Sequence, residues 1–161
     1  MKQYLNSYFL ILLASLFISC EKEVEPGQLK PYFKLTVNGA KKTVEACGTS
    51  DHVAQFLQDT LVFAAFGCGE QRAGFRLLGP VTDGTYELDH QHMAWYEESF
   101  VTYYTDSLRR GTLTVRSGSF QAAGGSIPYI EGRFSYEAID KNTGKTIRVS
   151  NGTYLLRKHT Y

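Results

Sequence analysis

Apolar and polar side chains alternate with a period of two from Gly111 toward the end of the chain, and this pattern constrains the fold most strongly. In the clearest run, apolar side chains occupy every second position at Phe134, Tyr136 and Ala138. Leu113 alternates with threonines in the same way. Because successive side chains of a strand point to opposite faces, this period is typical of half-buried β-strands.

Turn signals separate the expected strands. Asn38-Gly39 lies between the alternating run Phe33–Val37 and a second run, Lys41–Ala46, which predicts a β-hairpin. Asn-Gly tolerates the positive φ angles of the tight turns that match strand twist. Near the other end, Asp140–Gly144 predicts a hairpin loop with glycine at the left-handed position.

Two further runs settle the fold class. Residues 60–66 are apolar on both faces, which predicts a central strand covered on both sides. Residues 93–104 also fit a short helix, but their aromatic and β-branched content favours a strand. No helical period persists beyond about two turns, so we predict an all-β fold, a single antiparallel β-sandwich of about eight to ten short strands. A closed lipocalin-like β-barrel is the alternative.

The first residues indicate an export signal. Lys2 precedes an apolar run, Tyr8–Ile18, which ends just before Cys20, although Phe17 stands where bacterial lipoprotein signals usually carry leucine. The run is too short for the ~30 Å hydrocarbon core of a bilayer. We therefore predict a cleaved signal peptide at residues 1–19, lipidation of Cys20, a flexible tether over residues 20–31 and a β-sandwich domain at residues 32–161. The predicted location is the outer membrane, with the lipid as the contact to the membrane.

Lipidation of Cys20 leaves Cys47 and Cys68 as an even pair in an exported chain. Export places them where disulfides persist, so we predict a disulfide between them. Two separate buried thiols are the alternative.

Several segments resemble a family of small outer-membrane lipoproteins of Bacteroidota, a domain of unknown function. The segments, which spread over most of residues 32–158, are Phe33-x-Leu-x-Val-Asn-Gly, Gly84-Thr-Tyr-Glu-Leu, Gly111-Thr-Leu-Thr-Val, Ile130-Glu-Gly-Arg-Phe-Ser-Tyr-Glu-Ala and Lys145-Thr-Ile-Arg-Val-Ser-Asn-Gly-Thr-Tyr. These are strand and turn signatures. The resemblance therefore implies a location and a fold, and it transfers no active-site residues.

Two features fit this resemblance. Glu21, Glu23 and Glu25 resemble the acidic signal that sends such lipoproteins to the cell surface, although Lys22 interrupts them. Asp59-Thr60-Leu61 and Asp106-Ser107-Leu108 match the O-glycosylation acceptor pattern of those bacteria.

The candidate site residues are few. His90 and His92 would share one face of a strand and are weak candidates for a metal site, but no third ligand is evident. The aromatic side chains of Trp95, Tyr96 and Tyr103 are the candidate binding surface, because exposed rings stack on sugars or anchor protein contacts.

These observations predict a surface-anchored, non-catalytic binding or accessory module. Its partner would be an outer-membrane protein complex or a glycan. No cofactor is expected, and the net charge of +1 argues against nucleic acid. A β-barrel that binds a small ligand is the first alternative function, and a metal-dependent enzyme that uses His90 and His92 is the second.

Overall fold

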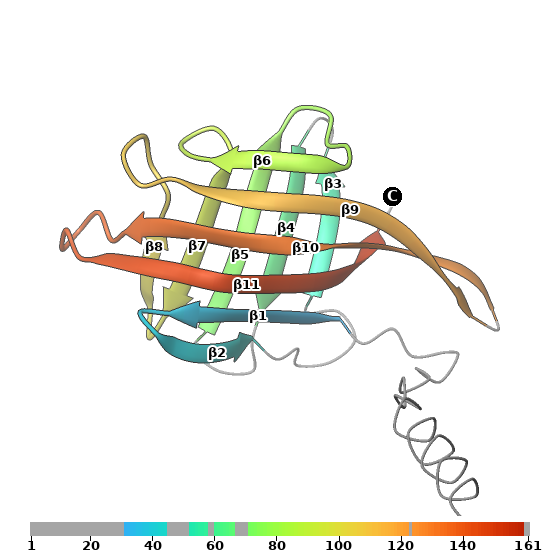
Figure 1. Cartoon of the computed structure of the whole chain (residues 1–161), viewed down its shortest axis with the longest axis horizontal. Coiled ribbons are helices and arrows are strands. Elements are labelled where there is room, and N and C mark those ends of the chain that lie inside the picture. Colours follow the sequence, from blue (N-terminus) through green and yellow to red (C-terminus); the bar gives the residue numbers. More distant parts are fainter. Residues whose placement is uncertain (1–30, 45–51, 58–59, 67–70, 123, 160–161) are drawn as a thin grey trace, which may run out of the picture.

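The computed structural model describes residues 31–44, 52–57, 60–66, 71–122 and 124–159. Every regular element in these residues is a β-strand (Figure 1), which confirms the all-β class. The strands are β1 (Tyr32–Val37), β2 (Ala40–Val44), β3 (His52–Leu57), β4 (Thr60–Phe66), β5 (Gln71–Leu78), β6 (Gly84–Leu88), β7 (Met93–Glu98), β8 (Val101–Tyr104), β9 (Gly111–Ala122), β10 (Gly125–Ile139) and β11 (Thr146–His159).

The strands form two layers that cross each other (Figure 1). The front layer contains β6, β9, β10, β11, β1 and β2, and behind it run β3, β4, β5, β7 and β8. Short pairings join the layers at two corners. β11 pairs with β3 through Arg157, Lys158 and His159, and β10 pairs with β8 through Ile139 and Tyr104. The β11–β3 pairing is parallel, whereas the others are antiparallel.

Aromatic rings fill the space between the layers. Phe134 on β10 lies 4.9 Å from Phe33 on β1 and 4.9 Å from Phe75 on β5, measured between ring centroids. Tyr154 on β11 is fully buried against the same cluster. The strand order ends at β2 on one side and at β6 on the other. Because aromatic side chains fill the space between two crossed layers, the fold is a sandwich with a packed interior and not a closed lipocalin-like barrel.

Several local expectations are confirmed. Asn38 and Gly39 adopt positive φ angles of 48° and 86° in the β1–β2 turn. Gly144 has a φ of 73° in the β10–β11 loop, as expected for the left-handed position. β4 pairs with β3 on one side and with β5 on the other, so it is a central strand as predicted. Leu61 is buried but Val62, on the opposite face, is only half-buried, so coverage of both faces is not confirmed.

Other details differ from the prediction. The described residues contain eleven strands, and β9, β10 and β11 are long, with 12, 15 and 14 residues. The segment predicted as one strand over residues 93–104 is a hairpin, β7 and β8. Its turn consists of Ser99 and Phe100, with φ angles of 52° and 66°. β3 begins at His52, which the sequence analysis did not place in a strand.

A buried hydroxyl links the β6–β7 loop to the end of β8. Thr105 is only 3% exposed, and its Oγ1 accepts the Ala94 N–H at 2.9 Å and donates to the Asp89 carbonyl at 2.9 Å. We expect Thr105→Val to lower the free energy of unfolding by about 1–3 kcal/mol, because the buried Ala94 N–H and the half-buried Asp89 carbonyl lose this partner. Urea denaturation of the full-length chain in detergent measures this. Thr105→Ser is the control because it keeps the hydroxyl, and an equal loss in that variant would contradict this explanation.

Candidate functional site

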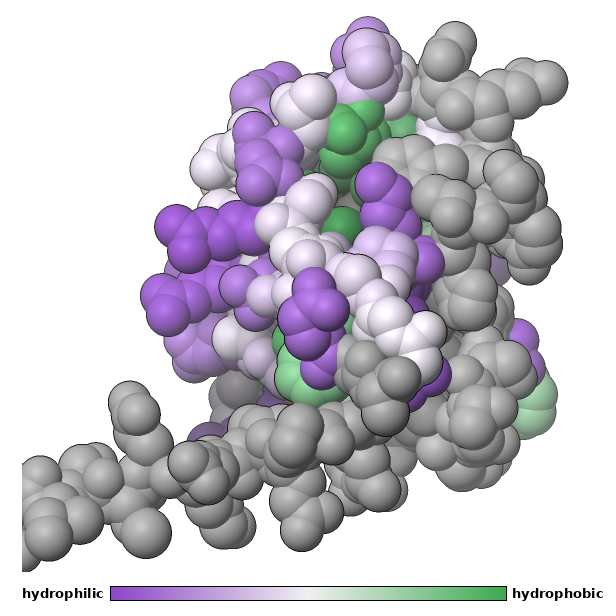
Figure 2. Space-filling model, turned by 90° about the vertical axis from the view of Figure 1, so that its right-hand side faces the viewer, coloured by the Kyte–Doolittle hydropathy of each residue, from purple (hydrophilic) through white to green (hydrophobic). Residues whose placement is uncertain are grey.

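The outward-facing side chains of β9, β10 and β11 form a polar surface on the front layer. Inward positions of these strands, such as Leu113, Ile130 and Leu156, are buried, so the alternate positions face solvent. Figure 2, in which the front of Figure 1 lies toward the left, shows mainly hydrophilic residues there. We call this surface the β9–β11 face, and it consists of Thr112, Thr114, Arg116, Glu131, Arg133, Ser135, Arg148, Ser150, Asn151 and Thr153.

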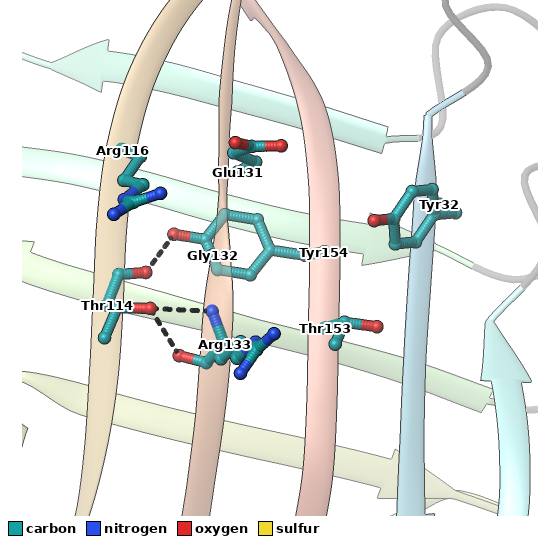
Figure 3. Close-up of a pocket in the computed structure, with 8 residues that line it drawn as sticks. All are labelled: Tyr32, Thr114, Arg116, Glu131, Gly132, Arg133, Thr153 and Tyr154. Carbon is teal, nitrogen blue, oxygen red and sulfur yellow. Dashed lines mark hydrogen bonds between the residues drawn. The ribbon is translucent and has the colours of Figure 1, made fainter. Parts of the chain in front are cut away.

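A pocket of about 530 Å³ opens on this face beside Gly132 (Figure 3). We call it the Gly132 pocket. Its lining combines cationic, hydroxyl and aromatic side chains from four strands: Tyr32, Thr114, Arg116, Glu131, Gly132, Arg133, Thr153 and Tyr154. A ligand here would meet several hydrogen-bond donors at once.

At the pocket, side-chain hydrogen bonds take the place of backbone hydrogen bonds between β9 and β10. Thr114 Oγ1 accepts the Arg133 N–H at 2.8 Å and lies 3.3 Å from the Arg133 carbonyl, to which it donates (Figure 3). From the interior, the Tyr154 hydroxyl donates to the Thr114 carbonyl at 2.8 Å. Burial raises the pKa of Tyr154, and the charge of Glu131 raises it further, so the hydroxyl remains a donor.

A second pocket, of about 560 Å³, adjoins the first. The two share Thr114, Arg133 and Thr153, so they form one depression across the three strands. The remaining residues of the second pocket are mostly small or polar: Thr112, Phe134, Ser135, Arg148, Ser150, Asn151 and Gly152.

The arginines of the β9–β11 face are not held in close ion pairs, although Glu131 lies opposite Arg116 and Glu137 opposite Arg148 across the strands. Within the described residues, the guanidinium groups of Arg116, Arg133 and Arg148 form no ion pair. By contrast, Arg109 pairs with Asp106 at 3.1 Å and Arg110 with Glu87 at 2.9 Å elsewhere on the molecule. Glu131, directly opposite Arg116 across β9 and β10, is the one carboxylate in the two linings.

The structure places the predicted aromatic surface largely in the core. Tyr96 is 1% exposed and Tyr103 is 7% exposed, and the two lie opposite each other on β7 and β8. They therefore do not belong to an exposed binding surface. Burial, followed by the charge of the nearby Glu98, raises the pKa of Tyr96. Trp95 is half-buried, and its carbonyl accepts a hydrogen bond from Tyr136 at 3.1 Å.

The histidine pair lies in a loop and not on a strand. Residues 89–92 connect β6 to β7, where Asp89 Oδ1 accepts the backbone N–H groups of Gln91 and His92. His92 Nδ1 accepts the Leu78 N–H at 3.3 Å, and His90 is exposed. In the described part of the chain, no three potential metal ligands come together.

The other predicted sites are placed only in part. Cys20, Cys47 and Cys68 lie outside the described residues, so lipidation and the disulfide remain predictions. In the two glycosylation patterns, Ser107 is exposed in the β8–β9 loop, whereas Thr60 begins β4 and is half-buried. Modification of either side chain also remains a prediction.

Searches against protein-family models, curated proteins and solved structures found no match. On the β9–β11 face, hydroxyl, amide and guanidinium groups converge in one depression. Such groups match carboxylates and hydroxyls, with guanidinium favouring carboxylates through its paired donors.

Proposed function

We propose that this protein is a lipid-anchored, non-catalytic binding module of the outer membrane, and that it binds an acidic polysaccharide through the β9–β11 face. The observation that carries the proposal is the set of Arg116, Arg133 and Arg148 without ion-pair partners in the described residues, surrounded by hydroxyl groups. A carboxylated, hydroxyl-rich polymer complements both features.

Charge and packing favour this ligand over the other candidates. The net charge of +1 is low for a protein that binds nucleic acid. The aromatic rings of Phe33, Phe75 and Phe134 pack between the layers, which argues against a small apolar ligand held inside. A long polymer suits an open depression on the outer surface.

The lipid on Cys20 is the proposed attachment to the membrane. The described residues contain no helix that is long and apolar enough to cross a bilayer. With the lipid on the tether, the folded domain would remain near the membrane surface and could contact polysaccharide there.

Removing the positive charges should weaken binding. We expect Arg116→Gln combined with Arg133→Gln to lower the affinity for polygalacturonate by about tenfold, equivalent to about 1.4 kcal/mol. Higher salt should weaken binding of the unmodified chain, because surface charges are screened. Isothermal titration calorimetry with the full-length chain in detergent measures both effects.

Arg76→Gln is the matched control, because it removes the same charge from an exposed position on β5 in the back layer. Neutral dextran is the ligand control. Equal binding of dextran and polygalacturonate, or an equal loss in the Arg76 variant, would contradict a specific role for the β9–β11 face.

A further inference from the structure

β9 and β10 continue past the neighbouring strands as a two-stranded arm (Figure 1). On the arm, Phe120 lies directly opposite Ile127. At its base, Tyr129 lies between Gly118 of β9 and Arg157 of β11. The four positions on β9 and β10 follow the alternation that points Arg116 and Glu131 outward, so the arm extends the β9–β11 face. Phe120, Ile127 and Tyr129 are half-buried. The polar face therefore ends at a strip of larger apolar groups.

The ring of Tyr129 lies across β9 at Gly118. A Cβ on Gly118 would stand 2.4 Å from Cζ of Tyr129 and 2.6 Å from its hydroxyl oxygen. The ring can occupy this place only because Gly118 has no side chain. One side of the ring is thus supported by backbone, and the half-buried ring keeps part of its surface toward solvent. We call this arrangement the Tyr129 shelf.

The Tyr129 shelf lies next to the arginines of the Gly132 pocket. The following outward pair along the two strands is Arg116 and Glu131, which line the pocket. Two residues along a strand correspond to about 6.6 Å. An aromatic surface and a guanidinium group without an ion-pair partner in the described residues are therefore adjacent.

We propose that the Tyr129 shelf stacks against the C–H face of a pyranose ring while Arg116 binds the carboxylate of the same or the next sugar. This inference rests on the proposed function and specifies its ligand class, a polysaccharide that contains uronic acids. Pyranose rings present C–H groups on one face, which pack against aromatic rings. A carboxylate polymer without rings would use the arginines alone.

Two variants test the shelf, and both are studied in the full-length chain. Tyr129→Leu removes the ring. Gly118→Ala keeps the ring but forces it off β9. We expect each to weaken binding of polygalacturonate by about tenfold and to change binding of polyacrylate, which has carboxylates but no rings, by less than about twofold. Tyr129→Phe should bind polygalacturonate as the unmodified chain does. Gly124→Ala is the matched glycine control, because its Cβ would meet nothing within 4 Å.

The outcomes separate this inference from the proposed function. If the unmodified chain does not bind polygalacturonate, the proposed function fails and the shelf fails with it. If it binds but Tyr129→Leu binds equally well, the shelf alone is refuted. Tighter binding of oligothymidylate than of polygalacturonate would also refute a glycan ligand, since nucleotide bases stack on aromatic rings too. Circular dichroism identifies any loss of folding in Gly118→Ala, and Tyr129→Leu then decides the question.

Discussion

Gly132→Ala is expected to destabilise the protein by at least about 3 kcal/mol, the upper end of the usual cost of overpacking. A Cβ at this position would lie 1.8 Å from the Thr114 carbonyl oxygen and 2.8 Å from the Tyr154 hydroxyl oxygen. The first contact involves backbone, so no side-chain rotation relieves it. β9 and β10 would have to separate, and the hydrogen bond between Tyr154 and Thr114 would be strained or lost.

Such a loss is a large fraction of the stability of a typical domain, about 5–15 kcal/mol. It should appear as a fall in melting temperature on the order of 10 °C and in the urea midpoint of the full-length chain. Gly84→Ala is the control, because a Cβ there meets nothing within 4 Å. If the Gly132 and Gly84 variants unfold at the same urea concentration, β9 and β10 do not approach each other as closely as described.

The sequence predicted the strands that have one apolar and one polar face. In β9 and β10, apolar inward positions such as Leu113 and Tyr136 alternate with polar ones, so local pattern and burial agree. The β7–β8 hairpin could not be found in this way. Its turn residues, Ser99 and Phe100, both take positive φ, which local sequence normally assigns to glycine or asparagine. Cross-strand pairs such as Tyr96 with Tyr103 hold the hairpin instead.

Periodicity also could not show which of two neighbouring aromatic side chains on β7 is buried. Trp95 and Tyr96 point to opposite sides of β7, and only the packing of the two layers shows that Tyr96 is the buried one. β3 was missed because its sequence, His-Val-Ala-Gln-Phe-Leu, does not alternate apolar and polar side chains.

The β9–β11 face was overlooked because its residues look like an ordinary solvated side of strands. Arginines, threonines and serines at alternate positions carry no motif. Whether these residues form a site depends on the strand register, which brings Arg116 opposite Glu131 and Gly118 opposite Tyr129. The register begins with Ala122 opposite Gly125, whereas a turn assigned to Gly124 and Gly125 from the sequence would have shifted it by two residues.

Cys20→Ala should move the protein from the membrane fraction to the soluble fraction almost completely. Each buried methylene of a lipid contributes about 0.8 kcal/mol, and two or more acyl chains hold a protein firmly, whereas one chain binds only marginally. The predicted lipid on Cys20 would therefore account for nearly all of the attachment. Ultracentrifugation of lysed cells in high salt, followed by immunoblotting, measures the distribution.

Cys47→Ala is the matched control, because it removes a thiol that is predicted to pair with Cys68 and not to carry lipid. This variant should remain in the membrane fraction, as the unmodified chain does. Mass spectrometry of the unmodified chain should find acyl groups on Cys20, in a protein that begins at this residue. A Cys20→Ala chain that still sediments entirely with membranes in high salt would refute the lipid anchor and point to attachment through the folded domain.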